Sequence, residues 1–122
     1  RLDLGGRRCT GGAAARADLL AAQLRLSIAR ADLAQSVREQ FARAVTARER
    51  LRIATENEAI ARELARVASV LVEEGREPPL RAIRARSAAA QAAAELEAAR
   101  AEEQAARSTL ASLFGVTEPP ES

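Results

Sequence analysis

The stretch VEEGREPPLRAIRAR, residues 72–86, contains the break on which the fold depends. Gly75 is followed closely by Pro78 and Pro79. A glycine just after a helix, with proline a few residues later, is typical of a helix end, and proline is tolerated in the first turn of the next helix. Between residues 13 and 114 the chain contains no other glycine or proline. The sequence therefore predicts two helices joined by a turn at residues 75–79.

The composition favours long helices over a compact globule. The chain has 122 residues, of which 31 are Ala, and all 19 basic residues are Arg. Alanine buries little apolar area, so a globule of this size would need more large side chains to offset the chain entropy. Ala, Leu, Arg and Glu in bulk are typical of coiled coils. The net charge of +2 is spread over interspersed signs, which does not favour binding to nucleic acid.

The first predicted helix covers residues 13–74 and carries a long apolar stripe. The stripe positions are Leu20, Leu24, Ile28, Ala31, Ala34, Val37, Phe41, Val45, Glu49, Ile53, Asn57, Ile60, Leu64, Val67 and Leu71. Their mean spacing of about 3.64 residues is close to the period of a straight α-helix. A helix over these residues would span about 93 Å, which is too long for a small globule.

The second predicted helix, residues 80–114, carries a heptad seam of mostly small residues. With Ala82 at the first core position of the heptad, the apolar core positions are Ala82, Ala85, Ala89, Ala92, Leu96, Ala99, Ala106, Leu110 and Leu113, and Glu103 is the one polar member. Arginines and glutamates flank this seam, as in coiled coils. We predict that these nine apolar residues are a helix-packing seam at which neighbouring helices approach closely.

The predicted fold is therefore all-α, a long antiparallel, coiled-coil-like helical hairpin with unequal arms. The first half of the long arm carries leucines that the shorter arm does not reach, so this half needs partners from other copies or from further chain. The alternating residues 1–6, RLDLGG, predict a short strand remnant, within a strand-to-helix linker over residues 1–12. Residues 115–122 are predicted to be an extended tail. Because the chain begins with Arg1 and lacks a signal peptide, we expect it to be a segment of a longer protein.

The sequence offers no catalytic, cofactor or metal site. It contains no His and a single Cys, Cys9, so neither a His-based nucleophile system nor a Cys and His zinc site is available. Adjacent acids such as Glu73 and Glu74 point about 100° apart on a helix and do not converge on one atom. No apolar run is long enough for a transmembrane helix. We therefore predict a structural and interacting segment and not an enzyme.

Three stretches resemble the outer-membrane efflux protein family, the exit ducts of tripartite pumps, and most closely its heavy-metal branch. LDLGGRR, residues 2–8, resembles the strand-to-helix entry of that branch. LVEEGREPPLRAIRARSAAAQAAAELEAA, residues 71–99, is similar to the family's helical turn followed by an Arg-rich alanine repeat. STLASLFGV, residues 108–116, resembles the family's helix end.

The resemblance implies a periplasmic hairpin in a duct made of three copies. The helices would form part of an α-barrel across the periplasm, and strands elsewhere would form a barrel in the outer membrane. The turn would lie at the periplasmic tip, where it meets a periplasmic adaptor protein within a complex that also contains an inner-membrane pump. The residues implied in adaptor binding are Glu73, Glu74, Gly75, Arg76, Glu77, Pro78, Pro79, Leu80 and Arg81.

Two alternatives stay open from the sequence. The chain could be the coiled-coil hairpin of the adaptor itself, although adaptor arms are nearly equal in length. It could also be an unrelated helical scaffold. The exported substrate, metal ions or small toxic compounds, is not specified by these residues.

Overall fold

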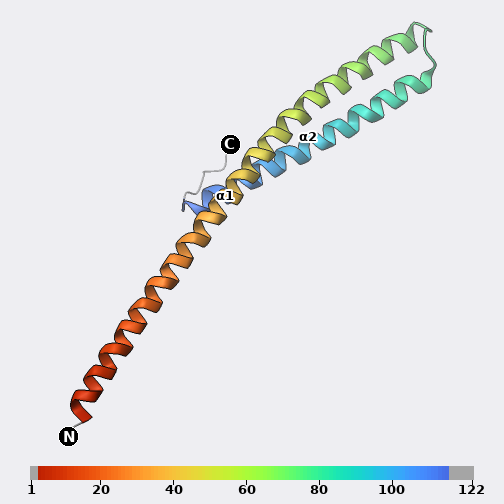
Figure 1. The fold of residues 1–122 in the computed structure, drawn as a ribbon. Coiled ribbons are helices and arrows are strands. Elements are labelled where there is room, and N and C mark those ends of the chain that lie inside the picture. The colour runs from red at the N-terminus through yellow and green to blue at the C-terminus, as the bar shows by residue number, and fades with distance from the viewer. Residues whose placement is uncertain (1–2, 116–122) are drawn as a thin grey trace. The chain divides into compact units, whose positions relative to one another are not determined.

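The structure is a computed structural model that describes residues 3–115, and over these residues it contains two helices and no strand. Helix α1 covers Asp3–Glu73, 71 residues, and helix α2 covers Pro79–Leu113, 35 residues. The chain divides into two compact units, Arg1–Arg38 and Glu39–Ser122. Within the second unit α2 returns alongside α1 from the turn (Figure 1). The predicted all-α hairpin with helices of unequal length is confirmed.

The predicted strand remnant near the N-terminus is wrong over the residues that are described. Helix α1 already begins at Asp3, so the helix that we expected from residue 13 starts ten residues earlier. An isolated strand leaves its backbone groups unpaired, whereas a helix satisfies them within the segment. The glycines of this region cost only about 1 kcal/mol each relative to alanine in a helix, so they do not stop it. Residues 1 and 2 lie outside the described residues.

The turn is closed by a Schellman motif at the end of α1. The N–H of Arg76 donates to the carbonyl of Leu71 at 2.9 Å, and the N–H of Gly75 donates to that of Val72 at 3.0 Å. Gly75 takes the left-handed conformation that the motif requires, with φ of 73°. Pro78 is extended, with φ of −69° and ψ of 150°, and Pro79 begins α2. The backbone thus reverses direction between Glu74 and Pro78.

Substituting Gly75 by Ala is expected to destabilise the hairpin by about 1 kcal/mol, because an L-residue with a side chain is strained at positive φ. The matched control is Gly12→Ala, at a helical glycine where an added Cβ meets no atom within 4 Å. There the same change is expected to stabilise the helix by about 0.5–1 kcal/mol. Thermal unfolding followed by circular dichroism measures the change in Tm of each variant. Shifts of Tm in the same direction for the two variants would contradict the strain expected at Gly75.

Helix α2 ends close to the position expected from the sequence. The N–H of Phe114 donates to the carbonyl of Ala111 at 3.1 Å, and that of Gly115 donates to Ser112 at 3.2 Å. Gly115 has a φ of 68°, again the left-handed conformation. The remainder of the predicted extended tail, residues 116–122, lies outside the described residues.

Large apolar side chains in the first unit are exposed. Their exposed fractions range from 51% for Leu26 to 60% for Leu19 and Ile28. In the second unit the buried core consists of Ala47, Ala65, Ala82, Leu96 and Ala99. Four of these five side chains are a single methyl group, so the helices approach closely around Leu96, the one large side chain of this buried core.

Candidate functional site

The predicted packing seam of α2 faces the interior of the hairpin. Ala82, Leu96 and Ala99 are buried, and the other six predicted seam residues are half-buried. These six are Ala85, Ala89, Ala92, Ala106, Leu110 and Leu113. The polar member of the same register, Glu103, is also shielded, with 20% of its side chain exposed, and lies 3.9 Å from Arg107. The heptad register read from the sequence therefore describes the face that α2 presents to α1.

The matching face of α1 is a second seam, which sequence reasoning missed. Its members are buried or half-buried and alternate in steps of four and three residues: Gln40, Ala44, Ala47, Leu51, Ala54, Glu58, Ala61, Ala65, Ala68 and Val72. This is a regular heptad spacing. The repeated alanines at heptad spacing were the signal that could have revealed it. Small residues on both sides allow the two backbones to approach closely.

The large apolar residues of α1 lie beside this seam and remain exposed. We use the term lateral stripe for Phe41, Val45, Ile53 and Ile60, whose exposed fractions are 60%, 53%, 44% and 59%. Each lies one residue before or after a seam position, or about 100° around the helix. The contact between α1 and α2 thus consists mainly of alanines, and the bulkier side chains of α1 lie outside it. Phe41 and Val45 follow seam residues, whereas Ile53 and Ile60 precede them, and exposed apolar patches of this kind mark interaction sites.

Glutamates and arginines on the outer side of α1 are paired within the helix. Arg52 donates through Nη1 to Oε1 of Glu56 at 2.7 Å and through Nε to Oε1 of Glu49 at 3.0 Å. This hydrogen bond from Arg52 lowers the pKa of the Glu49 carboxyl, and that from Arg66 lowers the pKa of Glu63. All these groups are solvent-exposed, so they support local helix structure and need no further partner.

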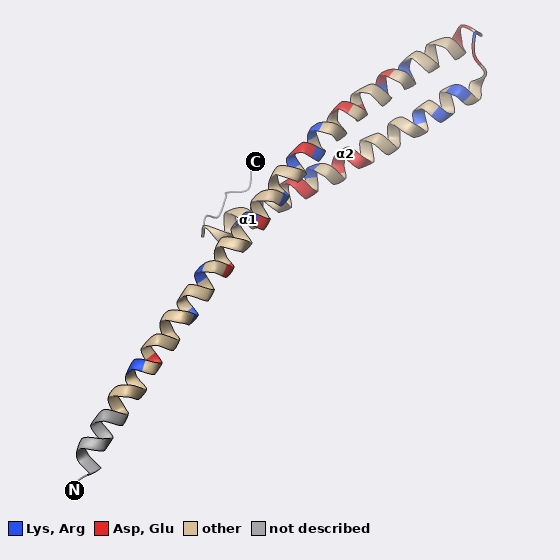
Figure 2. Cartoon of the chain, in the orientation of Figure 1, with Lys and Arg blue, Asp and Glu red and all other residues tan. Residues whose placement is uncertain are grey.

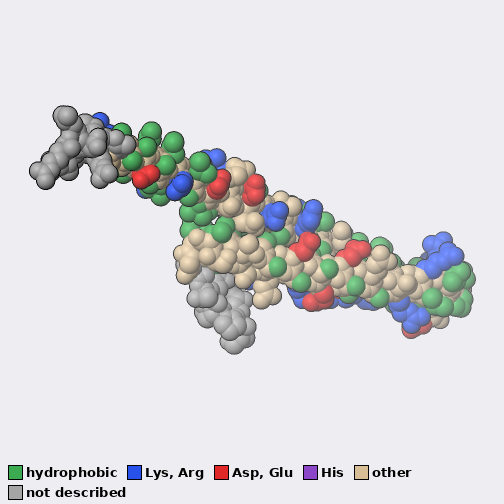
Figure 3. Space-filling view, turned by 90° about the horizontal axis from the view of Figure 1, so that it is seen from below, with side chains coloured by type: hydrophobic (Ala, Val, Ile, Leu, Met, Phe, Trp, Pro, Cys, Tyr) green, Lys and Arg blue, Asp and Glu red, His purple; other side chains and the backbone are tan. Residues whose placement is uncertain are grey.

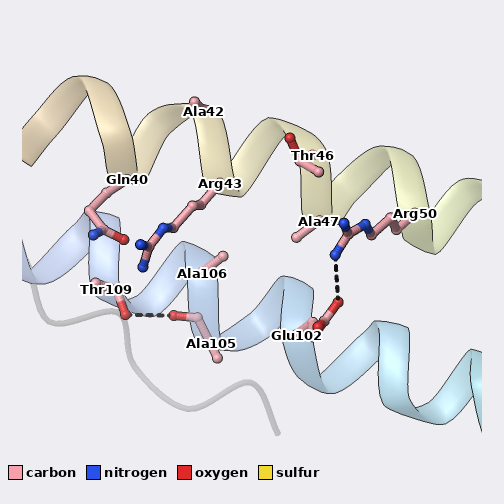
Figure 4. A pocket seen from close by; sticks show the side chains of 10 residues that line it. All are labelled: Gln40, Ala42, Arg43, Thr46, Ala47, Arg50, Glu102, Ala105, Ala106 and Thr109. Atoms are coloured by element: carbon pink, nitrogen blue, oxygen red, sulfur yellow. Dashed lines mark hydrogen bonds and ion pairs between the residues drawn. The ribbon is translucent and has the colours of Figure 1, made fainter.

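A groove of about 510 Å³ lies between the two helices at the end of the hairpin distant from the turn. Figure 4 shows Arg43 and Arg50 of α1 on one side of it and Glu102 and Thr109 of α2 on the other. Nη1 of Arg50 lies 3.7 Å from Oε2 of Glu102, an ion pair that joins the two helices. Both side chains are more than half exposed, so the pair contributes about 1 kcal/mol or less.

The turn presents almost all of its predicted adaptor-binding residues to solvent. Of the nine residues from Glu73 to Arg81, all are exposed except Glu77, which is half-buried. Nη1 of Arg76 lies 3.5 Å from Oε2 of Glu74, and Nε of Arg81 lies 3.5 Å from Oε2 of Glu77. Such exposed pairs are weak and can exchange partners at little cost. The turn is therefore a charged, accessible surface with exposed Leu80 at its side.

Neither a metal centre nor a membrane span is found in the part of the chain that the structure describes. No group of three or more His, Cys, Asp or Glu residues there could hold a metal ion. No helix among those residues is sufficiently long and apolar to cross a bilayer.

These features define a class of protein: a helical hairpin that buries a seam of small residues and exposes large apolar side chains and a charged turn. The chain belongs to the outer membrane efflux protein family, whose family model matches residues 1–116. It is therefore a segment of an efflux duct, a class of transport channel rather than of enzyme, and not the hairpin of an adaptor. No curated protein and no solved structure matches the chain.

Proposed function

We propose that the chain forms one helical hairpin in the wall of a trimeric duct and that its turn binds a periplasmic adaptor protein. A position in the duct wall is supported by the two different faces of α1. The alanine seam packs on α2, whereas the lateral stripe is exposed. Burying an apolar side chain of this size stabilises an assembly by about 1.5–3 kcal/mol, so neighbouring helices of the duct gain by covering the stripe.

The proposed docking surface is the turn, residues 73–81. Its charged side chains, apart from the half-buried Glu77, are exposed, and they form only weak ion pairs, in which Arg76 lies 3.5 Å from Glu74 and Arg81 lies 3.5 Å from Glu77. The two prolines and the Schellman motif fix the backbone of this surface before a partner arrives, which reduces the ordering cost of binding. The accompanying inner-membrane pump would then contact the duct through this adaptor.

The proposed cargo class is metal ions or small toxic compounds. It rests on the resemblance of residues 2–8 and 71–99 to the heavy-metal branch of the family. In this proposal the periplasmic hairpin encloses the path and need not bind what passes through.

Exchanging the charges at the turn by Arg76→Glu with Glu77→Arg is expected to weaken adaptor capture by about tenfold, which corresponds to about 1.4 kcal/mol. The measurement is photo-crosslinking from position 80 to the adaptor in a full-length duct that carries this chain. The matched control exchanges two exposed charges of α1 that lie far along the chain from the turn, Arg30→Asp with Asp32→Arg, and is expected to leave capture unchanged. Crosslinking to the adaptor from other regions but none from the turn would refute the docking proposal.

A further inference from the structure

The groove of about 510 Å³ at the end of the hairpin distant from the turn has no large apolar side chain among the residues that line it. We call it the end groove. Its apolar lining residues are all alanines, among them Ala47 of α1 and Ala106 of α2, which lie between the two helices in Figure 4. An amphipathic helix binds through large apolar anchors, which this groove does not offer. A short, extended segment with small apolar groups fits it better.

The end groove carries an arginine that the hairpin does not neutralise. Arg50 lies 3.7 Å from Glu102 across the groove, whereas the side chain of Arg43 has no ion pair or hydrogen bond with any residue that the structure describes. Beyond Arg107, helix α2 has no charged residue, as Figure 2 shows for its last turns. Over the middle of the hairpin, by contrast, acidic side chains lie beside basic ones (Figure 3). Arg43 is therefore available to an acid from a segment outside the two helices.

The chain supplies such a segment directly after α2. Residues 116–122, VTEPPES, contain two acids, Glu118 and Glu121, and no basic residue. Gly115 has a φ of 68°, the left-handed conformation that turns a chain out of a helix. A proline restricts its own backbone and that of the residue before it to extended conformations, so Pro119 and Pro120 favour an extended segment. We call residues 116–122, which lie outside the described residues, the tail.

The reach of the tail matches the position of Arg43. Three residues span at most about 11 Å when they are extended, so Glu118 can lie that far from Gly115. Thr109, which lines the end groove together with Arg43, precedes Gly115 by six residues, or about 9 Å along α2. A tail that folds back along α2 can therefore bring Glu118 level with Arg43. Glu121 would come level with Glu102, which repels it, so Glu118 is the acid that fits.

We infer that the tail binds in the end groove, with the carboxylate of Glu118 on the guanidinium of Arg43 and the two prolines over Ala105 and Ala106. An exposed charge pair is weak by itself, so cover of the alanines by the prolines contributes as well. The tail also has the advantage of belonging to the same chain, because a short tether gives it a high effective concentration at the groove. The chain that follows α2 then leaves the hairpin on the face that carries this groove.

The test measures disulfide formation between the tail and α1 in a full-length duct that carries this chain and whose other cysteines, Cys9 included, are replaced by Ser. Thr117→Cys is combined with Gln40→Cys, which lines the end groove, or with Phe41→Cys, which lies about 100° around the helix and does not line it. A disulfide requires Cα atoms within about 7 Å. Each rate is divided by the rate at which the same α1 cysteine reacts with a small soluble disulfide. The normalised rate within one chain is expected to be at least about tenfold higher from position 40.

Charge reversal tests the pairing itself. Arg43→Glu is expected to slow the disulfide between positions 40 and 117 by about fivefold, and Glu118→Arg in the same chain is expected to restore it. The matched control is Arg48→Glu, at an exposed arginine of the same helix that does not line the end groove. It is expected to change the rate by less than about twofold. Restoration by the second substitution also shows that Arg43→Glu has not simply unfolded the hairpin.

Three results would overturn the inference. The first is an equal normalised rate from positions 40 and 41. The second is a loss of rate in Arg43→Glu that Glu118→Arg does not restore, or no loss at all. The third is a disulfide that joins two copies instead of forming within one chain, which non-reducing electrophoresis detects and which would assign the end groove to a second copy.

Discussion

Leu96→Ala is expected to lower the free energy of unfolding of the hairpin by about 2–4 kcal/mol, because it removes the one large side chain of the buried core and leaves a cavity. Leu96 is only 7% exposed, and the four other core residues are alanines. Alanines on both helices have no atoms with which to fill the space that is lost. The variant is therefore expected to lose most of its cooperative unfolding transition, measured by urea denaturation with far-UV circular dichroism.

The matched control for this substitution is Ile83→Ala on the same helix. Ile83 is 54% exposed, so the same type of truncation is expected to cost about 0.5 kcal/mol. If both variants lost the same stability, the burial of Leu96 would not be what holds the hairpin together.

Ile60→Glu is expected to reduce assembly of the proposed duct trimer by more than about tenfold while the hairpin keeps its own fold. Ile60 is 59% exposed in the hairpin, so a charge at this position is harmless until a neighbouring helix covers it. Burial of an unpaired carboxylate then costs several kcal/mol. The measurement is the yield of crosslinked trimer from a full-length duct that carries this chain, together with resistance of the cells to an exported compound.

The control is Ala59→Glu, at the next residue, which is exposed and lies outside the lateral stripe. It introduces the same charge about 100° around the helix and is expected to leave the trimer intact. Normal trimer yield for Ile60→Glu would show that the lateral stripe is not covered in the assembly.

The turn and the seam of α2 could be predicted from the sequence because both depend on local chemistry. Gly75 meets the requirement for positive φ, Pro79 fits a first helical turn, and the heptad of alanines repeats over the whole of α2. The predicted second helix, residues 80–114, differs by only one residue at each end from the observed Pro79–Leu113.

The face of α1 that contacts α2 was harder to predict, because the large apolar side chains of α1 do not lie on it. A stripe is recognised by its large side chains, and in this helix those are exposed at Phe41, Val45 and Ile60, whereas the buried positions are alanines such as Ala47 and Ala65. In the proposed duct a neighbouring helix covers the bulky residues, and a single chain does not contain that information. The strand expected near residues 1–6 failed for a similar reason, because a strand requires a neighbour to pair with.

On α1 the seam repeats at heptad spacing, whereas the large apolar side chains repeat at about 3.64 residues, and this difference has a consequence for neighbouring hairpins. Phe41 and Val45 each follow a seam residue by one position, whereas Ile53 and Ile60 each precede one. Since one position is about 100° of rotation, the exposed apolar side chains change from one flank of the seam to the other between residues 45 and 53. In the proposed duct wall, a neighbouring helix that remained in contact with both groups of side chains would therefore have to cross the hairpin obliquely.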